Sequence, residues 1–268
     1  MGIKNLTPEA LREYIRTHHE NVYVLVDVRQ PQEYRMGHIP GARLMPLPDL
    51  VRGMDQLPAQ KDLLFYCHSG GRSMAAAAMV AEEGFGERIY NLEGGMLRWD
   101  GAKIEDLPKV ALFAGQSLAE RFQTAMNLEK GAQLFYESVA RKWAGQDWSQ
   151  TFARLAKAEV AHARMAHGYW RQIDETIDSF EPIYERMKGD VLEGGLTLDE
   201  ALKRVSGVKK EACLRLIEMA LQIEYAAFDL YRNLADEVNT EEGRQAFLGL
   251  SHAEKAHMEA LIGDIEAC

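Results

Sequence analysis

The sequence predicts two domains: an α/β domain with a mainly parallel sheet and helices on both faces, followed by an all-α domain. Strand-like and helix-like segments alternate in residues 1–108, which is the pattern of a parallel sheet. Residues 116–268 carry apolar positions at helical spacing, in a two-helix unit that occurs twice. A length of 268 residues gives each domain enough chain for its own core.

Composition and charge narrow the class of protein. Hydrophobic residues make up 47% and charged residues 27% of the chain, as in ordinary globular proteins. The net charge of −10 argues against nucleic acid or an anionic membrane as partner. No stretch is long and apolar enough to cross a bilayer, so we expect a cytoplasmic protein. Cys67, Cys213 and Cys268 predict no disulfide framework, and we expect incidental or packing roles for the last two.

Helix start signals and buried-type strands predict the elements of the first domain. Thr7-Pro8-Glu9 begins a helix, with Thr7 as the N-cap. Strands are expected at 22–28, 63–66 and 88–92, and an alanine-rich helix at 74–83. In parallel sheets the working loops follow the carboxyl ends of the strands, which is where Cys67 falls.

A glycine-rich loop follows the second of these strands. Its backbone N–H groups and the next helix N-terminus would form an anion-binding cradle around the Cys67 sulfur. With Arg72 beside it, that cradle should lower the thiol pKa and make Cys67 reactive. A buried structural cysteine is the alternative. The predicted catalytic residues are Cys67 and Arg72, and the predicted substrate-binding loop residues are His68, Ser69, Gly70, Gly71 and Ser73.

These motifs resemble a single-domain rhodanese over residues 1–108. The resemblance rests on Val26-Asp27-Val28-Arg29, Glu33, the 37–42 segment Gly-His-Ile-Pro-Gly-Ala, the 67–73 loop, and Gly94-Gly95 with Trp99. It implies that Cys67 takes a sulfane sulfur from a small donor as a persulfide and passes it to a thiophilic acceptor. Related phosphatase loops have five residues between Cys and Arg, whereas this loop has four, which favours sulfur over phosphate. Asp27, Arg29 and His38 are interpreted as scaffold.

Residues 109–115 are expected to form a linker, and Ser117 to Glu120 a capping box that opens the second domain at residue 116. Within that domain, segments of about 117–171 and 208–264 repeat with an offset of 95 residues. The positions shared by both copies are two Glu-x-x-His pairs, two single glutamates and two tyrosines: Glu159 and His162 with Glu254 and His257, Glu129 with Glu224, and Tyr136 with Tyr231.

The repeated polar residues lie on apolar helix faces. Glu159 and His162 are three apart and therefore share a face, in line with Phe152 and Leu155. Four carboxylates aimed into a core would be prohibitive without compensation. Two divalent cations would cancel them, in the arrangement of carboxylate-bridged dinuclear sites between helices. Core polar residues, or glutamates on solvated faces, are the alternatives.

Residues 116–268 resemble the rubrerythrin branch of the ferritin-like superfamily on these motifs. The resemblance implies a four-helix bundle with one long crossover, commonly a dimer, and as metal ligands Glu129, Glu159, His162, Glu224, Glu254 and His257. It also implies two iron ions, with manganese possible, that reduce peroxide or oxygen. Tyr136 and Tyr231 are expected to hydrogen-bond the ligand carboxylates. Because no rubredoxin-like cysteine module is present, electrons would come from an external donor. We expect no chemistry in the crossover, residues 172–207.

Three functions remain open at this point. A two-headed redox enzyme would combine the Cys67 persulfide with peroxide or oxygen reduction, and the fusion suggests that persulfide or sulfide exchanges electrons with the metals. The second is an iron-storage or sensing module with a sulfur-delivering rhodanese. In the third, the rhodanese half is a binding domain and Cys67 is idle.

Overall fold

A computed structural model describes residues 2–208, 210–265 and 268. The chain forms two compact units, Met1–Leu107 and Pro108–Cys268, and each is described by itself. Within the described ranges, no helix has both the length and the apolar character needed to cross a membrane.

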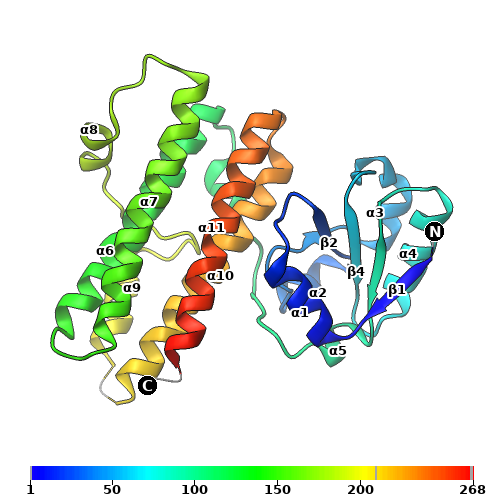
Figure 1. The fold of residues 1–268 in the computed structure, drawn as a ribbon, viewed down its shortest axis with the longest axis horizontal. Coiled ribbons are helices and arrows are strands. Elements are labelled where there is room, and N and C mark those ends of the chain that lie inside the picture. Colours follow the sequence, from blue (N-terminus) through cyan, green and yellow to red (C-terminus); the bar gives the residue numbers. More distant parts are fainter. Residues whose placement is uncertain (1, 209, 266–267) are drawn as a thin grey trace. The chain divides into compact units, whose positions relative to one another are not determined.

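The first unit is built on a five-stranded parallel sheet with the strand order β1-β5-β4-β2-β3 (Figure 1). Three strands match the sequence prediction, whereas β1 and β3 were not anticipated. The strands are β1 (Ile3–Leu6), β2 (Tyr23–Asp27), β3 (Arg43–Leu44), β4 (Asp62–Tyr66) and β5 (Ile89–Leu92). Every residue of β2, β4 and β5 is buried, as expected for strands covered on both faces.

Helices cover both faces of this sheet. One face packs Leu50 of α3 and Val80 of α4 against β2 and β4. The other packs Leu11 of α1, Tyr34 of α2 and Met96 of α5. The helices are α1 (Pro8–Thr17), α2 (Pro31–Arg35), α3 (Leu47–Arg52), α4 (Gly71–Glu82) and α5 (Gly95–Arg98), with a 3-10 turn η1 (Met54–Gln56). The parallel α/β class predicted for this domain is therefore confirmed.

The N-cap of α1 follows the sequence prediction, but α4 begins earlier than expected. Thr7 Oγ1 accepts a hydrogen bond from the Ala10 N–H at 3.2 Å, with Pro8 in the first turn. Helix α4 starts at Gly71 rather than at residue 74 because Gly70 adopts φ +95°, which turns the chain directly into the helix. As a result the first turn of α4 lies against Cys67.

The second unit is helical in the part of the chain that the structure describes. Four long helices, α6 (Leu118–Lys142), α7 (Ser149–Ile173), α10 (Ala212–Glu237) and α11 (Glu241–Ile265), pack chiefly as the pairs α6 with α7 and α10 with α11. Two short helices, α8 (Phe180–Glu185) and α9 (Leu198–Ser206), lie in the crossover between the pairs. Ser117 and Glu120 form the predicted capping box at the start of α6.

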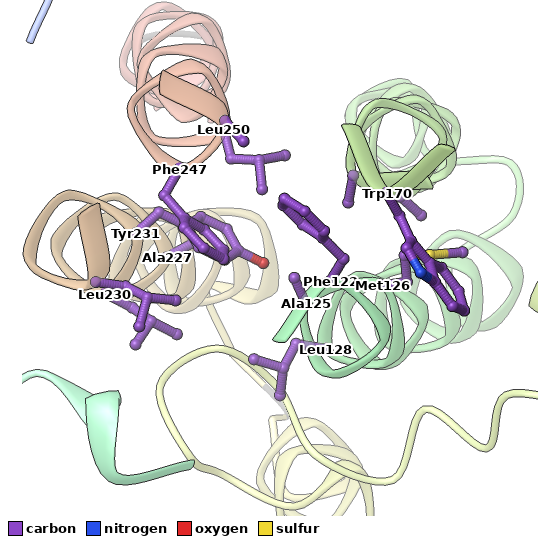
Figure 2. Close-up of a cluster of buried hydrophobic side chains, with 14 of the residues drawn as sticks. Phe122, Ala125, Met126, Leu128, Trp170, Ala227, Leu230, Tyr231, Phe247 and Leu250 are labelled. Atoms are coloured by element: carbon purple, nitrogen blue, oxygen red, sulfur yellow. The ribbon is translucent and has the colours of Figure 1, made fainter. Parts of the chain in front are cut away.

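The segment expected to be a linker carries structure of its own. Residues Lys109–Phe113 form a 3-10 helix, η2, and Phe113 is fully buried. Its ring packs edge-on against Phe247 of α11 at 6.3 Å between centroids. Figure 2 shows side chains of all four long helices in this core, including Phe122, Trp170, Tyr231 and Phe247. Phe113 therefore ties the start of the unit to its core.

The structure contradicts one expectation about the cysteines. Cys213 and Cys268 form a disulfide with a Cα–Cα distance of 5.5 Å, so they are not incidental. Helices α10 and α11 follow each other as neighbours, which brings the start of α10 close to the chain end beyond α11. That proximity depends on tertiary packing and could not be read from the spacing of 55 residues.

Candidate functional site

The first candidate site is the loop from Cys67 to Ser73. Cys67 directly follows β4, the central strand of the sheet, and the loop leads into α4. Cys67 is buried and is the one free cysteine among the described residues. Strand β4 delivers the thiol to the carboxyl edge of the sheet, and the N-terminus of α4 faces it.

Hydrogen bonds converge on the Cys67 sulfur. The Gly70 N–H donates to Sγ at 3.1 Å, and Ser73 Oγ lies 3.4 Å from the same atom. Burial raises the pKa of the thiol, but hydrogen bonds from the Ser73 hydroxyl and from the N–H groups of Ser73, Ser69 and Gly70 outweigh it, so the pKa is lowered overall. The loop therefore favours a thiolate.

The hydroxyl of Ser73 also contacts a side chain other than that of Cys67. Its Oγ also lies 2.7 Å from Asn91 Oδ1, and Asn91 Nδ2 donates to Asn5 Oδ1 at 3.0 Å. Asn91 lies on β5 and Asn5 on β1. Strand β5, which borders β4, and strand β1 beyond it thus fix the position of the Ser73 side chain.

The segment after β5 forms hydrogen bonds with the backbone of the Cys67 loop. The N–H groups of Met96 and Leu97 donate to the carbonyls of Cys67 and His68, each at 2.9 Å. A Cβ at Gly95 would lie 2.2 Å from the Cys67 carbonyl oxygen, so only glycine permits this approach. The Gly94-Gly95 pair therefore sets the loop conformation.

Besides its electrostatic interaction with Cys67, Arg72 forms an ion pair that was not predicted. Its guanidinium donates to both carboxylate oxygens of Glu33, at 2.8 and 2.7 Å. Hydrogen bonds from Arg72 hold the pKa of Glu33 at about 2, so the pair stays ionised over the working pH range. Of the predicted loop residues, His68, Ser69 and Gly71 are exposed, whereas Ser73 is buried beside the sulfur.

Two residues interpreted as scaffold form a buried ion pair, and a third packs beside it. The Arg29 guanidinium donates to Asp27 Oδ2 at 2.7 Å and to the Gly37 carbonyl at 2.8 Å. His38 is fully buried, with its ring stacked on Tyr34 at 3.7 Å between centroids. These contacts hold the segment after β2 in place, so a structural role accounts for all three.

The second candidate site lies among the four long helices. Helix α6 supplies Glu129 and Tyr136, and α7 supplies Glu159 and His162. Helix α10 supplies Glu224 and Tyr231, and α11 supplies Glu254 and His257. All eight side chains are buried. The structure thus brings together the six predicted ligands and both predicted tyrosines.

The two histidines lie at the centre of this cluster. Their rings stack at 4.5 Å between centroids. His162 Nδ1 lies 3.1 Å from Glu254 Oε1, 3.5 Å from Glu129 Oε2 and 3.6 Å from Glu159 Oε2. His257 Nδ1 donates to Glu224 Oε2 at 2.9 Å and lies 3.5 Å from Glu254 Oε2. Each ring therefore faces carboxylates from both helix pairs.

Each of the two tyrosines forms a hydrogen bond with a glutamate of the other copy of the repeat. Tyr136 of the first copy donates its hydroxyl proton to Glu224 Oε1 of the second. Tyr231 of the second copy donates in the same way to Glu129 Oε1 of the first. Each tyrosine thus orients a carboxylate that belongs to the other half.

The remaining oxygens of the cluster lack hydrogen-bond partners. Glu129 Oε2, Glu159 Oε1 and both oxygens of Glu254 are buried without one. Burial raises the pKa of Glu159 well above its usual value, and it raises that of Glu254 to about 7 despite the neighbouring His162. Native proteins seldom leave so many buried acceptors unpaired unless they bind a ligand.

The donor set fits a pair of metal ions. One ligand atom from each of Glu159, His162, Glu254 and His257 falls within a group in which all atoms lie within 4.8 Å of one another. Carboxylate and imidazole are ligands that iron, manganese and zinc accept. Glu129 and Glu224 stand at either side of this group with their tyrosines, so the arrangement can hold two cations between four carboxylates.

One buried carboxylate near this cluster was missed at the sequence level. Glu193 lies in the crossover, for which no chemistry was expected, and neither of its oxygens has a hydrogen-bond partner. The signal was a single acidic residue between Val191-Leu192 and the glycines at 194 and 195. Two further histidines lie on the helices that carry His162 and His257. His167 Nε2 lies 2.9 Å from the Asp178 carbonyl oxygen, which indicates a structural role, and His252 is exposed.

A parallel sheet that presents a cysteine in a backbone cradle defines the first unit as an α/β domain suited to thiolate chemistry. The Rhodanese-like domain family matches residues 7–102. YtwF of Bacillus subtilis is 39% identical over 101 residues, 38% of this chain and 94% of that protein. A sulfurtransferase of Allochromatium vinosum is 40% identical over 76 residues, 28% of this chain and 70% of that protein. Through this domain the chain belongs to the rhodanese-like family.

Among solved structures, a rhodanese-like domain protein from Staphylococcus aureus aligns with a TM-score of 0.35 and 26% identity. The alignment covers 38% of this chain and 98% of that one.

Proposed function

We propose that the chain combines a sulfurtransferase with a dinuclear iron centre that reduces peroxide or oxygen. The cradle around Cys67 Sγ supports the first activity, and the six buried, mutually facing ligands support the second. The helical unit would be a ferritin-like four-helix bundle of the rubrerythrin type, in keeping with its duplicated helix pairs.

Sulfur transfer proceeds in two displacements at Cys67. The thiolate attacks the outer sulfur of a donor such as thiosulfate, which forms the Cys67 persulfide and releases sulfite. A thiophilic acceptor such as cyanide then attacks the outer sulfur of the persulfide, which forms thiocyanate and returns the thiolate. The N–H groups of Ser69, Gly70 and Ser73 stabilise the negative charge on sulfur in each state.

Thiosulfate:cyanide sulfur transfer tests this proposal directly. Cys67→Ala should lower the rate at least about 1,000-fold, because the nucleophile is removed. Cys213→Ala, which alters a cysteine far along the chain, should retain the activity. Equal rates for wild type and Cys67→Ala would reduce the domain to a binding module.

In the helical unit, Glu129, Glu159, His162, Glu224, Glu254 and His257 would hold the metals. Two ferrous ions there would supply two electrons to a bound peroxide or oxygen. Tyr136 and Tyr231 orient the outer carboxylates through their hydroxyl protons, and the surrounding core excludes water. An external donor would return the electrons, while iron, or manganese in its place, is selected by supply.

Metal content after anaerobic purification tests the centre. We expect about two irons per chain, and their loss in Glu159→Ala/Glu254→Ala. Catalytic peroxide consumption with a supplied reductant would support the enzyme, whereas one stoichiometric oxidation would favour iron storage or sensing. A protein that cannot be loaded with metal would leave sulfur transfer as the sole proposed activity.

A further inference from the structure

The crossover between the two helix pairs is fixed closely against α6. The side-chain oxygen of Asn127 accepts hydrogen bonds from the N–H groups of Lys188 and Gly189, both at 3.1 Å. A Cβ on Gly131 would lie 2.4 Å from the Val191 carbonyl oxygen. Glycine at 131 therefore allows the crossover backbone to lie directly on α6, two residues beyond Glu129.

The same segment also contacts α10. A Cβ on Gly194 would lie 3.3 Å from the Ala226 side chain, and Ala226 is two residues beyond Glu224. Leu192 is fully buried in the core between these contacts. Glu193 is thus placed between Gly131 of α6 and Ala226 of α10, at the level where these helices carry Glu129 and Glu224.

The side chain of Glu193 is buried and lacks a polar partner. The residue is 1% exposed, and neither carboxylate oxygen makes a hydrogen bond. Burial raises the pKa of Glu193 well above its usual value, and the carboxylate of Glu129 raises it further. Its own backbone N–H opposes this rise, and Glu254 and Glu224 contribute smaller increases. A buried carboxylate placed among other carboxylates is destabilising unless a ligand compensates its charge.

We propose that Glu193 is a fifth carboxylate ligand of the dinuclear centre, supplied by the crossover rather than by the helix repeat. The inference rests on the proposed metal site and extends it by a residue outside the duplicated unit. It accounts for the close glycine contact at Gly131, which holds the crossover near the cluster, and for the two unpaired oxygens of Glu193. The centre then has seven protein ligands, and only one of them lacks a counterpart in the other half.

A fifth carboxylate changes the charge balance of the site. Four carboxylates match two divalent ions, whereas five leave one negative charge in excess. Glu193 should therefore strengthen the binding of metal and weaken the metal-free fold, since a buried carboxyl group without a hydrogen-bond partner is destabilising there whether it is charged or protonated. Removing the carboxylate should shift these two properties in opposite directions.

Titration of the metal-free full-length protein with Co²⁺ alone tests this assignment. Glu193→Gln should weaken the binding of at least one of the two ions by about tenfold or more, and it should change the visible absorption of bound Co²⁺ because a ligand is lost. The melting temperature of the metal-free variant should equal or exceed that of wild type. Glu185→Gln, an exposed glutamate of the same crossover, is the matched control and should bind as wild type does.

The outcomes separate the two proposals. If wild type binds no Co²⁺, the metal centre itself is wrong. If wild type binds two ions and Glu193→Gln binds them with the same affinity and spectrum, only the ligand role of Glu193 is wrong. Glu193→Met keeps the volume without the polar group. This second variant keeps the test decisive if Glu193→Gln fails to fold. A folded Glu193→Met protein with weakened Co²⁺ binding supports the assignment, whereas unchanged binding overturns it.

Discussion

The two candidate sites satisfy their polar groups in opposite ways. At Cys67, backbone N–H groups and one hydroxyl from the next six residues surround the sulfur, so the site is complete as folded. In the helical unit, carboxylates from residues 129 to 254 meet in the core, and several of their oxygens have no hydrogen-bond partner. The polar groups that surround the sulfur come from within six residues of Cys67, whereas the unpaired oxygens of the second site come from distant helices and would bind the cations that we propose.

Metal removal should produce the largest difference between the two sites, because it should destabilise only the helical unit. Chelation should lower the free energy of unfolding of the helical unit by about 4 kcal/mol relative to protein with free metal at 1,000 times Kd. Urea unfolding followed by circular dichroism measures the change. Sulfur transfer by the first unit should be unaffected, and a matching loss of that activity would break the comparison.

The disulfide provides a second perturbation confined to the helical unit. Cys213→Ser should lower the free energy of unfolding by about 2–4 kcal/mol, because a closed loop spanning 55 residues is opened. Sulfur transfer should again stay at the wild-type rate. Cys268→Ser is the control and should give the same loss. The double variant should add nothing further, and an additive effect would contradict the pairing.

Glu159→Gln tests whether metal binding explains the cluster oxygens that lack hydrogen-bond partners. It should remove most of the stabilisation that metal confers, since a ligand is lost. In the metal-free protein it should be neutral or stabilising, because a buried carboxylate without a partner is replaced by a neutral group. Thermal unfolding of both forms with and without Mn²⁺ measures this. Equal destabilisation in the two states would mean that the fold alone requires the carboxylate.

The smallest effect is expected at Ser73. The lowered pKa of Cys67 means that sulfur transfer should rise with pH and level off below the ordinary thiol range, because only the thiolate attacks. Ser73→Ala removes one hydrogen bond, so the midpoint should move to higher pH and the rate at pH 7 should fall about fivefold. Initial rates from pH 5 to 10 test this. Glu33 and Arg72 stay ionised throughout that range, so an unchanged midpoint would exclude Ser73 as the cause.

Local patterns predicted the elements that carry chemistry. The buried runs at β2, β4 and β5 and the loop after β4 follow from strand and turn signals within about ten residues. The 95-residue offset predicted that the six glutamate and histidine side chains cluster, because a repeat specifies which positions face the core. The reciprocal tyrosine contacts were anticipated only as bonds to carboxylates, without the exchange between halves.

Features that depend on tertiary packing escaped prediction. Strand β1 has only four residues, of which the middle two are exposed, so its pairing with β5 was not visible in the sequence. The ion pair of Arg72 with Glu33 joins residues 39 apart in the sequence, so it was not predicted. Glu193 lies outside the repeat, in a crossover whose backbone packs against α6 at Gly131, and that packing was not visible in the sequence.

The exchange of tyrosine and glutamate contacts has a consequence for the symmetry of the helical unit. Tyr136 needs Glu224, and Tyr231 needs Glu129, so neither half satisfies its own polar groups. Two copies of a single helix pair, related by a two-fold axis, would meet each other through the same self-complementary contacts. The helical unit is thus a tethered pseudo-homodimer, and Glu193, contributed by the tether, breaks its symmetry.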